Sequence, residues 1–261
     1  MDAVYVDHGR EVIPTEHARG PWDPNLQHGS APAALLARAV EREIGDRYGQ
    51  VVRLSVELMR PVPLAALTVK ARTVRAGKKL RLIEAVLSVG DVDVAQATAV
   101  WLRTTHLDLP ASTSETLRLR PPGPEAGQSP PPGATVSTGF FSGIDTRVVA
   151  GGFQLLGPAV AWFRVRRPIV AGEEPTPLMR MAAVADFANG LSSVLDLNDW
   201  SFVNADLTVW CHRYPSGEWI ALDSQTAIAA TGIGCSHSSV FDTSGPIGWS
   251  AQSLLLDRRI A

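Results

Sequence analysis

The same order of elements occurs twice in this chain, once on each side of a proline-rich stretch, and this repeat restricts the fold more than any single motif. A helix is expected between Ser30, which is a good N-cap, and Gly45, which stands just past the end, with Pro32 in the first turn. Its apolar residues recur at helical spacing and predict one buried face, made of Ala33, Leu36, Ala37, Val40 and Ile44.

The second half repeats this pattern. Thr176 is the expected N-cap of a second helix, with Pro177 at its first position and Gly190 as its terminator. A short strand is expected before each helix, at 3–7 and at 159–167. Four β-rich runs follow each helix, at 51–61, 64–74, 79–89 and 91–103 in the first half and at 201–213, 218–231, 234–242 and 247–258 in the second.

The stretch between the halves is rich in Pro, Gly, Ser and Thr and has no sustained apolar period. We therefore expect an N-terminal unit over 1–104, a proline-rich linker and connection over 105–150, and a C-terminal unit over 151–261. A long antiparallel sheet can bury the apolar stripe of one helix against one of its faces, and two such units would pair. The predicted fold class is α+β, with two units that each wrap one central helix in a long antiparallel sheet.

Composition excludes several kinds of protein. Lys and Arg number 24 against 26 Asp and Glu, which argues against nucleic acid or an anionic membrane as the main partner. The two cysteines are too few for a disulfide framework, the start has no signal-peptide pattern, and no apolar run approaches the roughly 18 residues that cross a bilayer. A cytoplasmic protein is expected. The six histidines are scattered and no G-x-S-x-G elbow is present, which disfavours a metal site and a serine hydrolase.

One family pattern covers most of the chain outside the linker. Its elements are the segment HGSAPAALLARA at 28–39, Asp206 followed by Trp210 and His212-Arg213, the pair Glu218-Trp219, and Gln252 in the last strand. In this order and spacing the sequence resembles the acyl-CoA thioesterase II family. The resemblance implies a double hotdog fold, an acyl-CoA substrate, no cofactor, and a homodimer or higher homo-oligomer.

The resemblance also implies a site. In that family a carboxylate, a hydroxyl and an amide hold the water that attacks the thioester, and the matching residues here are Asp206, Thr226 and Gln252. A carboxylate within hydrogen-bond reach accepts a proton from the water, while the other two groups orient it. Ser224 and Thr231 remain alternatives for the hydroxyl, and Asp206 has the alternative role of capping a turn.

The segment before the first helix has two interpretations. In the first, His28, Gly29 and Ser30 shape the entrance of an acyl-thioester pocket at the helix N-terminus, and Trp210 contributes to the wall of that pocket. In the second, the spacing of Asp23, Asn25 and His28 resembles that of the hydratase branch of the hotdog superfamily, in which an Asp and a His add water to an enoyl-CoA. A third possibility is a hotdog protein that binds acyl-CoA without hydrolysing it.

Overall fold

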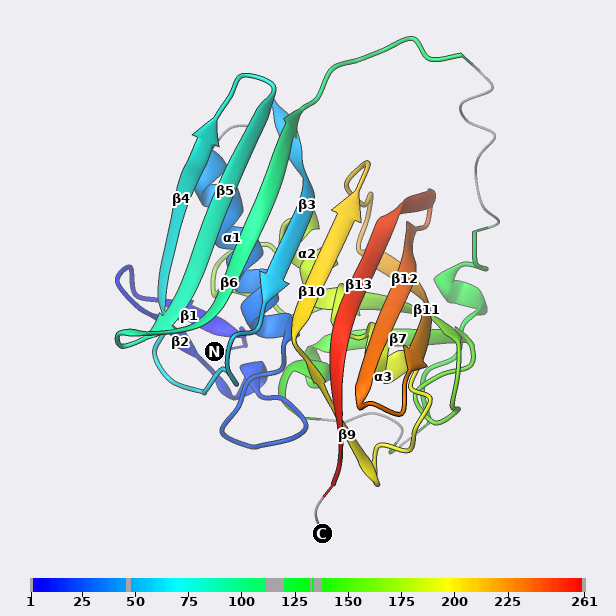
Figure 1. Cartoon of the computed structure of the whole chain (residues 1–261). Helices are drawn as coiled ribbons and strands as arrows, with labels where there is room; N and C mark the ends of the chain where they lie inside the picture. The colour runs from blue at the N-terminus through cyan, green and yellow to red at the C-terminus, as the bar shows by residue number, and fades with distance from the viewer. Residues whose placement is uncertain (1, 46–47, 111–119, 132, 134–137, 260–261) are drawn as a thin grey trace.

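The computed structural model describes residues 2–45, 48–110, 120–131, 133 and 138–259. One 11-stranded sheet organises the fold, with the helices packed against one of its faces (Figure 1). The strand order is β4-β5-β6-β3-β10-β13-β12-β11-β8-β7, with β9 paired to β13, and every pairing within the sheet is antiparallel. Among the described residues, no helix is long and apolar enough to cross a membrane.

The first unit consists of one helix and four strands. These elements are α1 (Ser30–Ile44), β3 (Gly49–Glu57), β4 (Thr68–Ala76), β5 (Leu80–Val89) and β6 (Val92–Arg103). The expected end of the helix is confirmed, because Gly45 has φ 67°, a left-handed conformation that glycine adopts without strain. At the other end the N-cap is Gly29, and Ser30 is the first helical residue.

The second unit repeats the arrangement with three extra strands. Its elements are β7 (Ile144–Ala150), β8 (Ala159–Val165), α2 (Pro177–Ala185), α3 (Ala188–Leu191), β9 (Trp200–Asn204), β10 (Asp206–Cys211), β11 (Trp219–Ile228), β12 (Ile233–Asp242) and β13 (Gly245–Arg258). The strand β7 lies in the range 105–150 that the sequence assigns to the connection, of which 111–119, 132 and 134–137 fall outside the described residues. The α+β architecture with two helix-and-sheet units is therefore confirmed, and the sheet of the second unit includes residues expected in the connection.

The two units join through β3 and β10. These strands pair from Asp206 opposite Glu57 to Trp210 opposite Arg53, so one sheet continues across the boundary between the units. On either side of this boundary the order is the same: β6, β5 and β4 follow β3, and β13, β12 and β11 follow β10. The repeat in the sequence thus becomes a pseudo-two-fold arrangement in the sheet.

The N-terminal segment crosses from the first unit to the second. The sequence predicts that 3–7 adds a strand to the first unit, but β1 (Tyr5–Asp7) pairs with β2 (Val12–Pro14) in a separate two-stranded sheet and forms a parallel bridge to the second unit, between Tyr5 and Val170. The Val4 N–H donates to the carbonyl of Pro168 at 3.0 Å, and the Tyr5 N–H donates to that of Ile169 at 2.9 Å. Short 3₁₀ turns at Glu16–Ala18, Pro124–Ala126 and Gly139–Gly143 complete the described elements.

Helix α1 is buried on all sides over its first eleven residues, because the sheet covers one face and α2 packs against the other (Figure 1). The apolar stripe expected from the sequence is therefore only part of the buried surface. Arg38 is buried in this region, and its guanidinium lies 2.7 Å from Asp7 and 2.5 Å from Glu173 of the second unit. These contacts pair a charge that would be costly to bury alone.

Candidate active site

The second helix is interrupted at a buried carboxylate. The sequence predicts a helix that ends at Gly190, whereas α2 ends at Ala185, α3 begins at Ala188, and Gly190 lies inside α3. The Phe187 N–H donates to the carbonyl of Val184 at 3.0 Å, which marks a tighter turn between the two helices. Asp186 occupies this turn and is only 6% exposed.

Three consecutive residues of the first unit converge on the Asp186 carboxylate. His28 Nδ1 lies 3.0 Å from Oδ2, and Ser30 Oγ donates to the same oxygen at 3.3 Å. At Gly29 an added Cβ would lie 2.8 Å from Oδ2, so the carboxylate fills the space that any larger residue needs. The residues that the sequence predicts at the pocket entrance therefore surround a carboxylate that the sequence did not single out.

The second unit supplies the remaining contacts of this carboxylate. Asn204 Nδ2 donates to Oδ1 at 2.8 Å, and Gln252 Nε2 donates to the same oxygen at 3.2 Å. Gln252 is itself fixed, because its Oε1 accepts the Asn189 N–H at 3.3 Å. Burial favours a raised pKa for Asp186, but the contacts with His28, Asn204 and Ser30 outweigh it and hold the pKa below its ordinary value. Asp186 is therefore a buried anion shared by both units.

Thr226 lies in the same inner row of the sheet as Gln252. Thr226 pairs with Ser236, and Ser236 pairs with Gln252, across β11, β12 and β13. The Thr226 hydroxyl lies 2.8 Å from that of Ser192 at the end of α3. The Ser236 hydroxyl, buried between the two predicted residues, has no hydrogen-bond partner among the described residues. The side chains of this polar row face the helices, and the Ser236 hydroxyl among them can bind a further polar group.

The two alternative hydroxyls lie elsewhere. Ser224 is buried one row further along the sheet, where its Oγ is 2.6 Å from that of Ser238. Thr231 is exposed in the turn after β11.

The structure does not bring Asp206 and Trp210 to this cluster. Side chains alternate along β10, so Leu207, Val209 and Cys211 face the helices while Asp206 and Trp210 face outward. Asp206 accepts the Ser253 N–H at 2.6 Å, and Trp210 is 41% exposed opposite Trp249. Burial, with a further contribution from the Asp206 charge, raises the pKa of the neighbouring Glu57. The alternation of apolar residues in this strand was the available signal that Asp206 faces away from Gln252.

Asp23 and His28 are not paired either. The Asp23 carboxylate accepts the Asn25 N–H at 2.7 Å within its own turn, while His28 contacts Asp186.

Aromatic rings enclose the His28 imidazole. The ring centroids of Phe140, Phe141 and Phe187 lie 5.6, 5.8 and 5.1 Å from that of His28. Phe187 follows Asp186 directly, and the two other rings belong to the 3₁₀ turn Gly139–Gly143. The polar cluster thus lies beside an apolar wall, an arrangement typical of sites that bind a substrate with an apolar part.

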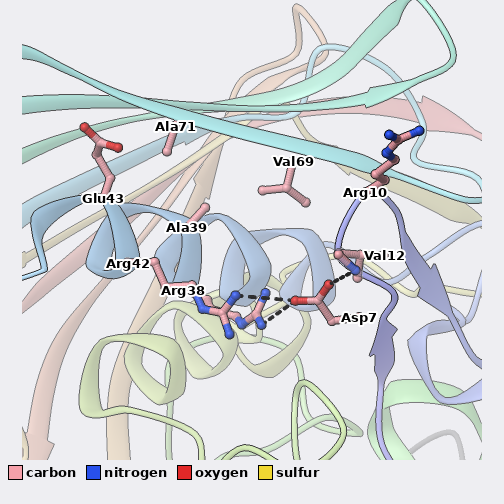
Figure 2. Close-up of a pocket in the computed structure, with 10 residues that line it drawn as sticks. Asp7, Arg10, Val12, Arg38, Ala39, Arg42, Glu43, Val69 and Ala71 are labelled. Atoms are coloured by element: carbon pink, nitrogen blue, oxygen red, sulfur yellow. Dashed lines mark hydrogen bonds and ion pairs between the residues drawn. The ribbon is translucent and has the colours of Figure 1, made fainter.

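A separate hollow of about 290 Å³ lies along the second half of α1 (Figure 2). Arg38 and Arg42 line it together with Asp7, and both guanidinium groups are paired with Asp7 and Glu173. None of the sequence-predicted site residues lines this hollow. Within the part of the chain that the structure describes, no group of three or more His, Cys, Asp or Glu residues could hold a metal ion.

Solved structures with a similar fold cover almost the whole chain. A candidate thioesterase II of Thermobifida fusca superposes with a TM-score of 0.77 at 15% identity, over 98% of this chain and 96% of that one. A hotdog-fold protein of unknown function from Alicyclobacillus acidocaldarius gives 0.73 at 16% identity, over 100% and 97%. An acyl-CoA thioesterase II of Mycobacterium marinum gives 0.64 at 16% identity, over 92% and 96%. No curated protein sequence matches the chain.

Two sequence models of one family match the two halves. The acyl-CoA thioesterase N-terminal domain matches residues 18–102, and the acyl-CoA thioesterase C-terminal domain matches residues 115–256. The first match contains the His28–Ser30 segment, and the second contains Asp186 and Gln252. The fold is a double hotdog, and the chain belongs to the acyl-CoA thioesterase family.

Proposed function

We propose that this protein hydrolyses an acyl-CoA thioester to the free acid and CoA at the cluster around Asp186. The observation that carries the proposal is the buried Asp186 anion at the junction of the two units, contacted by His28 and Ser30 from one and by Gln252 from the other. Family membership supports the reaction type, and the position of this cluster supports its location.

The surroundings of Asp186 fit hydrolysis by water. Gln252, Thr226 and the Ser236 hydroxyl present hydrogen-bonding groups along one row, and such groups can orient a water molecule. Among the described residues the Ser236 hydroxyl has no partner. The N-terminus of α1 begins at Gly29 and Ser30, so its positive dipole end lies where negative charge develops on the thioester oxygen. In this proposal Asp186 takes the place that the sequence pattern gives to Asp206, and Gln252 and Thr226 keep their predicted roles.

Thiol release from acyl-CoAs of several chain lengths tests the proposal and separates the two carboxylates. We expect Asp186→Asn to lower kcat/KM by at least about 100-fold, because the amide cannot carry the negative charge that organises the site. Asp206→Asn, on the outer face, is expected to keep activity within a few-fold of the wild type. The reverse result would restore Asp206 and remove Asp186 from the mechanism.

The same purified proteins also test the two other candidate functions, acyl-CoA binding without hydrolysis and enoyl-CoA hydration. If the wild type binds acyl-CoAs in calorimetry but releases no thiol, the protein is a non-catalytic acyl-CoA binder. If it instead consumes the double bond of crotonyl-CoA, and Asp23→Asn abolishes this, the hydratase interpretation holds. We expect neither, since the Asp23 carboxylate is engaged in its own turn and His28 contacts Asp186.

A homodimer or higher homo-oligomer and a cytoplasmic location remain predictions. The outer face of the central strands exposes Trp210 and Trp249 in directly opposed positions, with relative exposures of 41% and 53%. A second copy would remove this apolar surface from water. Light scattering after size exclusion gives the mass, and a monomer at micromolar concentration would contradict the predicted assembly.

A further inference from the structure

Two arginines at the end of β13 each lie over a tryptophan ring. The Cζ atom of Arg258 lies 5.0 Å from the centroid of the Trp200 ring, opposite it on β9, and that of Arg259 lies 4.9 Å from the centroid of the Trp22 ring. Both arginines are exposed, and Trp22 is 52% exposed. Stacking on an aromatic face fixes the plane of a guanidinium, while the N–H donors that point outward in that plane stay available to another group.

The charges of these two arginines are not neutralised by carboxylates. Arg164 is also stacked on a tryptophan, but it forms ion pairs with Asp145 at 2.5 Å and Glu218 at 3.7 Å. In the part of the chain that the structure describes, neither Arg258 nor Arg259 forms an ion pair. The end of β13 therefore presents two unbalanced positive charges, and phosphate is the anion whose oxygens best match the paired N–H groups of arginine.

This pair of charges lies at one end of the strand that carries Gln252. Alternate residues of β13 from Gln252 to Arg258 face the helices, because side chains alternate along a strand. Arg258 follows Gln252 by six residues, a distance of roughly 20 Å in a strand. Trp22, which contacts Arg259, belongs to the turn that leads to His28. Segments that reach the Asp186 cluster from both units therefore also meet at the two arginines.

The distance along β13 matches the length of the CoA arm. About fifteen bonds separate the sulfur of CoA from the second phosphorus of its diphosphate, as many as in five residues of extended chain, which span roughly 17 Å. CoA carries its negative charges on this diphosphate and on the 3′-phosphate beyond it. A thioester held at the Asp186 cluster can therefore place the phosphates of CoA at the end of β13.

We propose that Arg258 and Arg259, held over Trp200 and Trp22, bind the phosphate groups of the CoA moiety, an inference that rests on the proposed function, in which acyl-CoA is the substrate. Each guanidinium donates N–H groups to phosphate oxygens. Trp22 belongs to the first unit and Trp200 to the second, so this phosphate site, like the Asp186 cluster, contains residues of both units. The two arginines act on binding and take no part in cleavage of the thioester.

The double variant Arg258→Gln/Arg259→Gln tests the phosphate site with two substrates, an acyl-CoA and the acyl-pantetheine with the same acyl group, which has the thioester but no phosphate. We expect KM for the acyl-CoA to rise about ten-fold with kcat nearly unchanged, because contacts that hold substrate and transition state equally are lost. For the acyl-pantetheine, kcat/KM should stay within about two-fold of the wild type. Arg164→Gln, which removes a stacked arginine whose charge is already paired, is the matched control and should leave the kinetics of both substrates unchanged.

Calorimetry with CoA separates this inference from the proposed hydrolysis. If the wild type binds CoA and the double variant binds it about ten-fold more weakly, the phosphate site is supported, even if the wild type releases no thiol and the hydrolysis is refuted. Equal affinity of the wild type and the double variant for CoA would overturn the phosphate site. An equal rise in KM for the acyl-CoA and the acyl-pantetheine would overturn it as well, since the loss would then not involve the phosphates.

Discussion

At Gly29 the site has no room for a side chain. Its backbone is helical, with φ −57° and ψ −28°, so alanine is acceptable to the local conformation. The obstacle is the Asp186 carboxylate, which lies 2.8 Å from where a Cβ would stand and is held by three donors, on Ser30, Asn204 and Gln252. Glycine is required here because the Asp186 carboxylate fills the space of a side chain, and not because of the backbone conformation.

We expect Gly29→Ala to lower kcat/KM at least ten-fold with a small change in the unfolding midpoint, because the carboxylate must shift away from its donors. Gly190→Ala is the matched control, since an added Cβ there would find its nearest neighbour at 4.0 Å. That helical alanine is expected to stabilise the protein by roughly 0.5–1 kcal/mol and to leave activity unchanged. Wild-type activity in Gly29→Ala would mean that the position of Asp186 does not matter.

Single residues show how far the sequence predicts the site. The His28–Ser30 segment was identified because a polar run before a helix N-terminus is a local pattern, and the inward direction of Gln252, which shares a face with Leu254 and Leu256, follows from alternation. Asp186 was missed because its importance depends on contacts with residues more than 60 positions away, His28 and Gln252. An acidic residue within an otherwise apolar helical run was the signal for it.

At the scale of elements, α1 and α2 are linked by a half-buried acidic residue. Glu41 Oε2 accepts a hydrogen bond from Thr176 Oγ1 at 2.5 Å, and the same Thr176 oxygen accepts the Met179 N–H at 3.2 Å as the N-cap of α2. The caps that the sequence predicts for this helix, Thr176 and Pro177, are thus confirmed. Burial raises the pKa of Glu41 from its ordinary 4.5 to about 7.

This shift predicts how stability depends on pH. Below pH 4.5 Glu41 is protonated in both the folded and the unfolded protein, so it does not lower the free energy of unfolding. Between pH 4.5 and about 7 the unfolded chain loses the proton that the folded protein keeps. The free energy of unfolding therefore falls as the pH rises through this range. Above pH 7 the penalty is complete, up to about 3 kcal/mol. Glu41→Gln is expected to be more stable than the wild type at pH 8, with the difference shrinking toward pH 5 in urea denaturation. A difference independent of pH would contradict this account.

In the whole molecule, the two units share their main interactions. The sheet is continuous from β3 to β10, and Arg38 of the first unit pairs with Glu173 of the second. The order of elements and the duplication are local and periodic features, so they could be predicted from the sequence. The pairing of the N-terminal segment with 168–169 and the inclusion of β7 in the sheet could not, because they depend on contacts between segments far apart in the chain.

We therefore expect one cooperative unfolding transition for the whole chain and not one for each unit. In calorimetry the measured enthalpy and the van't Hoff enthalpy should agree, because neither unit can lose its structure without exposing the shared sheet and helix interface. Two resolved transitions, with activity lost in the first, would show that the units are independent.

The central claim is that the thioester is cleaved where the two units meet. A crystal structure of the wild type with an acyl-CoA analogue, in which a methylene replaces the thioester sulfur, tests this claim most directly. We predict that the analogue's carbonyl group lies at this cluster, beside Asp186, Gln252 and the N-terminus of α1. A carbonyl group in the hollow beside Arg38 and Arg42, or on the outer face beside Asp206, would contradict it.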